Sequence, residues 1–204
     1  MRVVIHLRAT DMSPSRIRQR GFSLLELLVA LVVFSVGLLA VAGLQTVSKQ
    51  ASFEAVQRTT ASQVANGLLE NIRTNGDAAG IYLAAGEVGG GSRGNEPVPN
   101  CKAGAECNSA QIAAHDLWFW EQMLDGTFES NAGVGTGGLV APTLCVVGPV
   151  AGGAGIYQVT IVWRGSASLT SLANNVCGTL TGNYGDNNEF RRLLQIPTYI
   201  DPTF

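Results

Sequence analysis

Four cysteines are the side chains best able to form covalent bonds. They all follow the N-terminal apolar region: Cys101, Cys107, Cys145 and Cys177. An even number of cysteines in that position suits an oxidising compartment, in which thiols pair as disulfides. A zinc site is the alternative, but the chain has no C-x-x-C motif and no closely spaced histidine to support one. We therefore expect two disulfides, and the sequence leaves three pairings open.

Acid–base chemistry has little support. His115 is the only histidine beyond the N-terminal segment, and it stands beside Asp116 on the expected exposed face of a helix. No recognised motif ties a serine or cysteine to it. None of the glycine-rich stretches precedes a lysine in a phosphate-binding pattern. The sequence thus favours a non-enzymatic protein without a cofactor or metal, and an anchored enzyme remains the alternative.

The start of the apolar segment has a pattern that suits proteolysis. Gly21 directly follows Arg20 and directly precedes Phe22, and an acid, Glu26, stands inside the apolar segment. Glycine lacks a Cβ, which lets a protease approach the backbone closely. A cut there leaves the apolar segment on the product. A carboxylate near the bilayer costs a few kcal/mol unless it is paired or hydrated. We therefore expect Glu26 to have a cationic partner.

One long apolar segment positions these residues. The stretch from Leu27 to Leu44 has no charged residue, and it meets the lower limit of about 17 residues for a helix that crosses a bilayer. Arginines crowd the N-terminal side, which places that end in the cytoplasm: Arg2, Arg8, Arg16, Arg18 and Arg20. Since the net charge is −2, the rest of the chain is mildly acidic and has no electrostatic footprint for direct binding of nucleic acid.

A secretory signal peptide and a generic signal anchor are the alternatives for this segment. A signal peptide has a shorter apolar region and is cut after it. Here the region is long, and Ala42-Gly43 is a weak cleavage site. Gly21 before the segment and Glu26 inside it argue against both alternatives.

The stretch from Arg20 to Glu26, followed by an apolar run, resembles the class III leader junction of type IV prepilins and pseudopilins. In that family a membrane peptidase cuts after the glycine and methylates the new N-terminal residue. The resemblance implies a prepilin peptidase as partner, residues 1–21 as leader, cleavage between Gly21 and Phe22, and N-methylation of Phe22. Met12 begins a compact leader, so we expect that translation can start there; a precursor peptide containing Arg8 would refute that start.

In a filament, the N-terminal amine of a neighbouring subunit is a suitable partner for Glu26. We therefore hypothesise that Glu26 sets the axial register between subunits by pairing with the Phe22 amine of a neighbour. A carboxylate that is merely hydrated at the membrane surface is the alternative.

One unbroken helix is expected over residues 22–75, with its transmembrane part at about 24–44. No proline interrupts it, and Gly76 suits its C-terminal stop. Apolar residues past the membrane recur at three- and four-residue intervals, which predicts a stripe that packs against the head: Val47, Ala51, Ala55, Ala61, Ala65, Leu69 and Ile72, widened by Phe53, Val56, Val64 and Leu68.

Residues 76–204 are expected to form an α+β head. Ser109 can cap a helix that runs through Leu124 and ends at Gly126, with Trp118 to Trp120 assigned to the core. Antiparallel strands are predicted at Thr143–Val147, Ile156–Arg164 and Phe190–Ile196. In the second of these, alternation places one set of side chains on one face and a polar set on the other: Tyr157, Val159, Ile161 and Trp163 against Gln158, Thr160 and Arg164. The glycine-rich loops are interpreted as flexible surface linkers. A Cys145–Cys177 bond would tie a loop to this sheet, and a Cys101–Cys107 bond would close a small loop ahead of the second helix.

The head sharpens the resemblance. Residues 107–120, the strand from Tyr157 to Arg164, and Asn71–Asn75 resemble PilV-type minor pilins. This implies a subunit that, with other minor pilins and the major pilin, primes filament assembly near the tip. It would be anchored in the inner membrane, with its N-terminus cytoplasmic and its head periplasmic, before incorporation into the pilus. A minor pseudopilin of a type II secretion system is the alternative, and an adhesive or DNA-uptake role is a further one.

Overall fold

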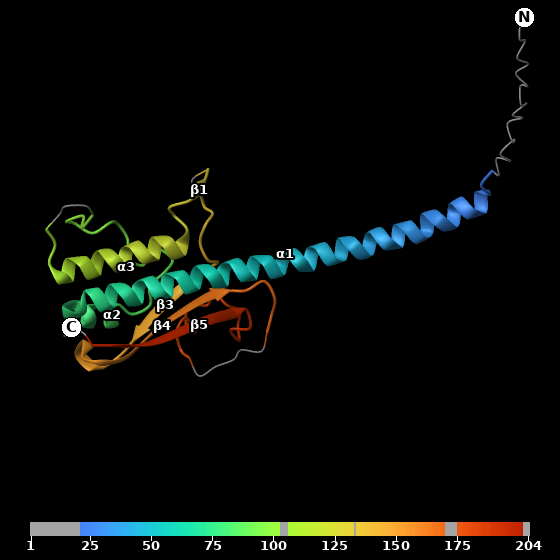
Figure 1. Cartoon of the computed structure of the whole chain (residues 1–204). Helices are drawn as coiled ribbons and strands as arrows, with labels where there is room; N and C mark the ends of the chain where they lie inside the picture. Colours follow the sequence, from blue (N-terminus) through green and yellow to red (C-terminus); the bar gives the residue numbers. More distant parts are fainter. Residues whose placement is uncertain (1–20, 103–105, 133, 170–174, 202–204) are drawn as a thin grey trace, which may run out of the picture. The chain divides into compact units, whose positions relative to one another are not determined.

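The computed structural model describes residues 21–102, 106–132, 134–169 and 175–201. The leader expected at residues 1–21 lies outside these ranges, except for Gly21. Two compact units divide the chain, residues 1–46 and 47–204, and each is described by itself. Helix α1 (Leu24–Thr74) contributes residues to both units (Figure 1).

In the first unit, α1 begins directly after Ser23. The Leu25 N–H donates to Ser23 Oγ at 3.3 Å, and the Leu27 N–H donates to the Ser23 carbonyl at 3.2 Å. The serine hydroxyl thus satisfies one N–H group that has no partner within the helix. The apolar side chains that follow are exposed throughout this unit.

The second unit is the head, built around the remainder of α1. After α1 come a 3₁₀ turn (Gly76–Ala78), α2 (Ala79–Leu83) and α3 (Ser109–Asp125). A small hairpin pairs β1 (Ser130–Asn131) with β2 (Val134–Gly135). The main antiparallel sheet has the order β3-β4-β5, formed by β3 (Thr143–Val147), β4 (Gly155–Arg164) and β5 (Arg191–Ile200), with a 3₁₀ turn at Val150–Gly152. The α+β prediction is confirmed.

The core lies between the head portion of α1 and the inner face of the sheet. In Figure 1 this part of α1 runs between α3 on one side and the sheet on the other. The β4 side chains expected on one face are all buried against it: Tyr157, Val159, Ile161 and Trp163. Alternation along a strand places such residues on a common face, and α1 supplies the opposing face through Ala61, Val64, Ala65, Leu68, Leu69 and Ile72.

The predicted stripe on α1 was too long. Val47, Phe53 and Val56 are 64%, 50% and 61% exposed, and Ala51 and Ala55 are exposed too. Burial begins only at Gln57 and Ala61, because the sheet and α3 cover just the last part of the helix. Periodic spacing reports an apolar face, but it does not say where the covering layer ends.

The helix ends differ in detail from the expectation. Asn108, not Ser109, caps α3: its Oδ1 accepts the Gln111 N–H at 2.9 Å, and Gln111 Oε1 accepts the Asn108 N–H at 3.0 Å. Gly126 does end α3, with φ 70°, where a Cβ would lie 2.1 Å from the Gly138 nitrogen. Gly76 instead opens the 3₁₀ turn, because the buried Asn75 amide donates to the Ser109 carbonyl at 2.8 Å and holds the chain there.

Candidate functional site

The junction between Gly21 and Phe22 lies just ahead of α1. Residues 21–23 are not helical, so the peptide bond between Gly21 and Phe22 is free of the helical hydrogen-bond pattern. Among the described residues, and apart from its chain neighbours, no atom lies within 4 Å of the position that a Cβ on Gly21 would take, and Phe22 is 82% exposed. A non-helical, open segment is the form that a protease can bind in an extended conformation.

Glu26 stands in the first turn of α1, four positions after Phe22. The N-terminal end of a helix carries a partial positive charge, which favours a carboxylate in the first turn. Its side chain is exposed within the described residues. The carboxylate is therefore free to meet a cation supplied by another molecule.

The apolar part of α1 meets the length and composition needed to cross a membrane, and it is the one such helix among the described residues. Its large side chains are mostly 50–85% exposed, among them Leu31, Phe34, Leu39 and Val41. Side chains of this kind left in water would cost about 1.5–3 kcal/mol each. A lipid or protein environment must therefore surround this segment.

In the head, two disulfides join the four cysteines: Cys101 to Cys107 and Cys145 to Cys177. This is one of the three pairings that the sequence leaves open. The first bond closes a short loop ahead of α3, and the second ties the chain that follows β4 to β3.

The expectation that His115 lies on an exposed face of the helix was wrong. It is 8% exposed, and its Nε2 lies 3.5 Å from Glu96 Oε1. Glu96 also pairs with Lys102 at 2.7 Å, and this ammonium group, followed by the histidine, lowers the pKa of the Glu96 carboxyl. The Lys102 ammonium also lies 5.4 Å from the Trp118 ring centroid. The histidine thus belongs to a cluster that holds the Cys101–Cys107 loop to α3.

Asp116 faces the tyrosine of α2. The Tyr82 hydroxyl donates to Asp116 Oδ2 at 2.5 Å. Burial raises the pKa of the Asp116 carboxyl, and burial followed by this hydrogen bond raises that of Tyr82. In the described part of the chain, no serine or cysteine side chain donates to His115 or Asp116, and no group of three potential metal ligands gathers. Asp116 joins α3 to α2, and His115 joins α3 to the preceding loop; within the described residues neither forms a nucleophilic site.

The first glycine-rich loop is not a loose linker, contrary to its interpretation from the sequence. Glu121, fully buried on α3, accepts the N–H groups of Gly89 (3.1 Å) and Arg93 (2.8 Å) and the Ser92 hydroxyl (2.6 Å). One turn later, Asp125 accepts the N–H groups of Gly90 and Gly91, at 3.0 and 2.9 Å. Neither role was predicted from the sequence; two acids spaced by four, directly after the Trp118–Trp120 cluster, were the available signal.

Comparison with protein families gives two matches. Residues 16–42 match a family described as the prokaryotic N-terminal methylation motif, and residues 43–118 match the family of the type IV pilin Tt1218. The first match spans the junction, Glu26 and most of the apolar segment. No curated protein and no solved structure gives a significant match.

The fold and the junction together define a class of protein, in which one long apolar helix that starts with a methylation motif bears a small α+β head. Within that class, the chain is a type IV pilin-like protein. The family is structural rather than enzymatic. Its methylation motif implies processing by a prepilin peptidase and assembly with other pilins.

Proposed function

We propose that this protein is a minor pilin of a type IV pilus that helps to prime or cap filament assembly near the tip. The observation that carries the proposal is the methylation motif at residues 16–42, which coincides with an open junction and an exposed apolar helix. The likeness of the head to PilV-type minor pilins supports the minor role and the tip position.

In this proposal residues 1–21 are removed by cleavage between Gly21 and Phe22, and Phe22 is then N-methylated. The apolar part of α1 holds the product in the inner membrane, with its N-terminus cytoplasmic and residues 76–204 periplasmic. The N-terminal arginines support this orientation, and so do two disulfides in the head, since disulfides persist in oxidising compartments. Other minor pilins and the major pilin are the partners, through the N-terminal helix.

The processing step can be tested with Gly21→Val. A branched side chain at the cut would obstruct the close approach of the peptidase, so we expect unprocessed precursor to accumulate in cells that contain the peptidase. Intact-mass measurement and N-terminal peptide sequencing would detect this. Gly37→Ala is the control, because beyond the helix's own backbone no atom of the described residues lies within 4 Å of the added Cβ, and cleavage should proceed normally. Normal processing of Gly21→Val, or a mature chain that begins elsewhere than at Phe22, would refute the assignment.

A minor pseudopilin of a type II secretion system shares the junction and the helix, and is the second candidate. A deletion separates the two. Loss of surface filaments and twitching with secretion intact supports the pilus, whereas loss of secretion with filaments intact supports the pseudopilus. A measurable activity on a substrate, with filaments and secretion both intact, would instead favour an anchored enzyme.

A further inference from the structure

The outer face of the sheet, opposite α1, is partly covered by the chain between β4 and β5. Residues 175–190 of this chain form that cover, and we call them the outer cover. Beneath it lies a second buried cluster formed by Val162, Cys177 and Tyr184, with Cys145 and Leu193 packed against it. Thr160, on the same face of β4, is only 2% exposed. The alternation of β4 predicted a polar outer face, and the outer cover explains why that face is buried instead.

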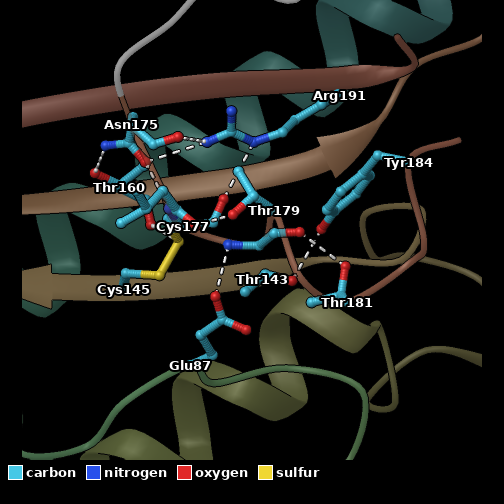
Figure 2. The surroundings of a disulfide bond; sticks show 12 residues. Glu87, Thr143, Cys145, Thr160, Asn175, Cys177, Thr179, Thr181, Tyr184 and Arg191 are labelled. Carbon is cyan, nitrogen blue, oxygen red and sulfur yellow. Dashed lines mark hydrogen bonds between the residues drawn. A yellow bond between two sulfur atoms is a disulfide. The ribbon is translucent and has the colours of Figure 1, made fainter. Parts of the chain in front are cut away.

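A buried arginine holds the start of the outer cover (Figure 2). Arg191, 7% exposed, donates from Nε to the Cys177 carbonyl at 3.1 Å. Its Nη2 donates to the Asn175 carbonyl at 2.6 Å and to Asn175 Oδ1 at 3.2 Å. Within the described residues these acceptors are neutral, and no carboxylate forms an ion pair with Arg191. The Nε and Nη2 donors are thus both directed at the backbone and side chain around one cysteine.

Further contacts hold the chain on either side of that cysteine. Asn175 Oδ1 accepts the Cys177 N–H at 2.9 Å, and Glu87 Oε1 accepts the Gly178 N–H at 2.7 Å. Farther along, the Tyr184 hydroxyl bonds to the Ala141 carbonyl at 2.8 Å and lies 2.9 Å from Thr143 Oγ1. Non-covalent contacts therefore hold the chain on both sides of Cys177, which lies over β3, where Cys145 stands.

We propose that Arg191 is the positioning residue that directs Cys177 to Cys145, and so selects one disulfide pairing among the three that four cysteines allow. The bond forms by thiol–disulfide exchange with an external disulfide oxidant. One thiolate displaces a thiolate from the oxidant and forms a mixed disulfide, which the second cysteine thiolate attacks. Two thiols lose two protons and two electrons, and the oxidant leaves as two thiols. A hollow of about 270 Å³, lined in part by Cys145, Val147 and Cys177, gives a small oxidant access to the pair.

Linkage sets the size of the effect. Two equilibria are coupled here: docking of the outer cover and formation of the Cys145–Cys177 bond. If docking favours the disulfide by a given factor, the disulfide favours docking by the same factor. A hydrogen bond to a charged group contributes enough to change an equilibrium by about tenfold or more. Loss of the Arg191 fork should therefore lower the preference for the Cys145–Cys177 bond by about tenfold.

The experiment follows oxidation of the reduced full chain in detergent micelles, with reduced and oxidised glutathione. Free thiols are alkylated at timed intervals, and peptides are mapped by mass spectrometry. In Arg191→Gln we expect the Cys145–Cys177 bond to form about tenfold more slowly, with Cys177 mispaired to Cys101 or Cys107. The Cys101–Cys107 bond should form at its usual rate, and it is an internal control. Arg192→Gln is the matched variant, because the Arg192 guanidinium bonds to the Ala167 carbonyl instead of the outer cover.

Hydrogen exchange of the full chain gives a second readout. In Cys145→Ser, which lacks the bond, we expect the amides of Cys177 and Gly178 to remain protected, and in Cys145→Ser combined with Arg191→Gln we expect that protection to be lost. Loss of this amide protection in Cys145→Ser alone would mean that the disulfide, and not Arg191, positions the outer cover, and it would overturn the proposal. Equal slowing of both disulfides in Arg191→Gln would make Arg191 a general folding residue, and unchanged pairing would leave it no role; either result also overturns the proposal.

Discussion

Two acidic residues of α3 tie the head together, although neither was expected to be structural. Glu121 accepts three hydrogen bonds from a glycine-rich loop, and Asp116 joins α3 to α2 by accepting a hydrogen bond from Tyr82. A buried carboxylate costs free energy unless donors surround it. Each site therefore makes the head depend on contacts between segments that lie far apart in the chain.

Replacing the Glu121 carboxylate by an amide should destabilise the head. Glutamine would present an NH₂ group to at least one of the N–H donors that Glu121 now accepts, and it would leave that buried donor unsatisfied. We expect Glu121→Gln to lower the free energy of unfolding by about 1.5–3 kcal/mol. Denaturant titration of the full chain in micelles, followed by tryptophan fluorescence, measures this. Glu129→Gln is the control, since the side chain is exposed, and equal loss in both variants would contradict the prediction.

Asp116 should make the stability of the head depend on pH. Burial raises the pKa of its carboxyl above the ordinary 3.8, so the folded head binds this proton more tightly than the unfolded chain does. The contribution of Asp116 to the free energy of unfolding therefore falls as pH rises from 3.8 through the raised pKa, and is constant above it. Asp116→Asn should remove this component. Unfolding of both proteins between about pH 3 and pH 7 tests it, and parallel pH profiles would refute it.

At the scale of the elements, α1 and α3 approach closely because one residue lacks a side chain. A Cβ on Gly67 would lie 2.3 Å from Trp120 Cη2 and 2.6 Å from Cζ2. Trp120 packs against the main core, so its ring has little room to move. The distance between the two helices is thus set by a glycine of α1 that meets a tryptophan of α3.

Gly67→Ala should therefore destabilise the head by about 1–3 kcal/mol, the usual cost of overpacking a core. The tryptophan fluorescence and the near-UV circular dichroism should change too, because the ring must shift. Gly37→Ala makes the same chemical change on α1 where, in the described structure, only the helix's own backbone is near, and it should leave the unfolding of the head unchanged. A Gly67→Ala head as stable as the original would show that the two helices separate freely.

How far the sequence predicts these elements depends on the range of the interactions. The β3 bounds and the inner face of β4 follow from local alternation, and Gly126 from local helix-end chemistry. Burial of Thr160 and Val162 does not, because the outer cover lies on them from a segment remote in sequence. His115 was misplaced for a similar reason, since Glu96 of a preceding loop, itself paired with Lys102, lies against it. Local periodicity identifies faces, and only the tertiary fold shows what covers each one.

At the scale of the whole molecule, α1 has two environments along its length. Its last part is buried by the head, and its first part exposes apolar side chains within the described chain. The junction, the exposed Glu26 and the exposed stripe at Val47, Phe53 and Val56 all belong to the part without a cover. Assembly with other subunits would cover such surfaces, so variants there should affect incorporation and leave the head folded.

Glu26→Ala tests this separation. We expect leader cleavage and methylation of Phe22 to proceed, because the junction is unchanged, whereas the amount of subunit in sheared filaments should fall by more than about tenfold. Loss of one partner of a desolvated ion pair costs about 3–5 kcal/mol, and the amine of a neighbouring Phe22 would lose its carboxylate. Glu70→Ala is the matched control, since that acid pairs with Arg73 on the exposed surface of the same helix and contributes little. Mass spectrometry of sheared filaments and membranes gives both quantities. Normal incorporation of Glu26→Ala would mean that the carboxylate is only hydrated at the membrane surface, and that another feature of α1 sets the register.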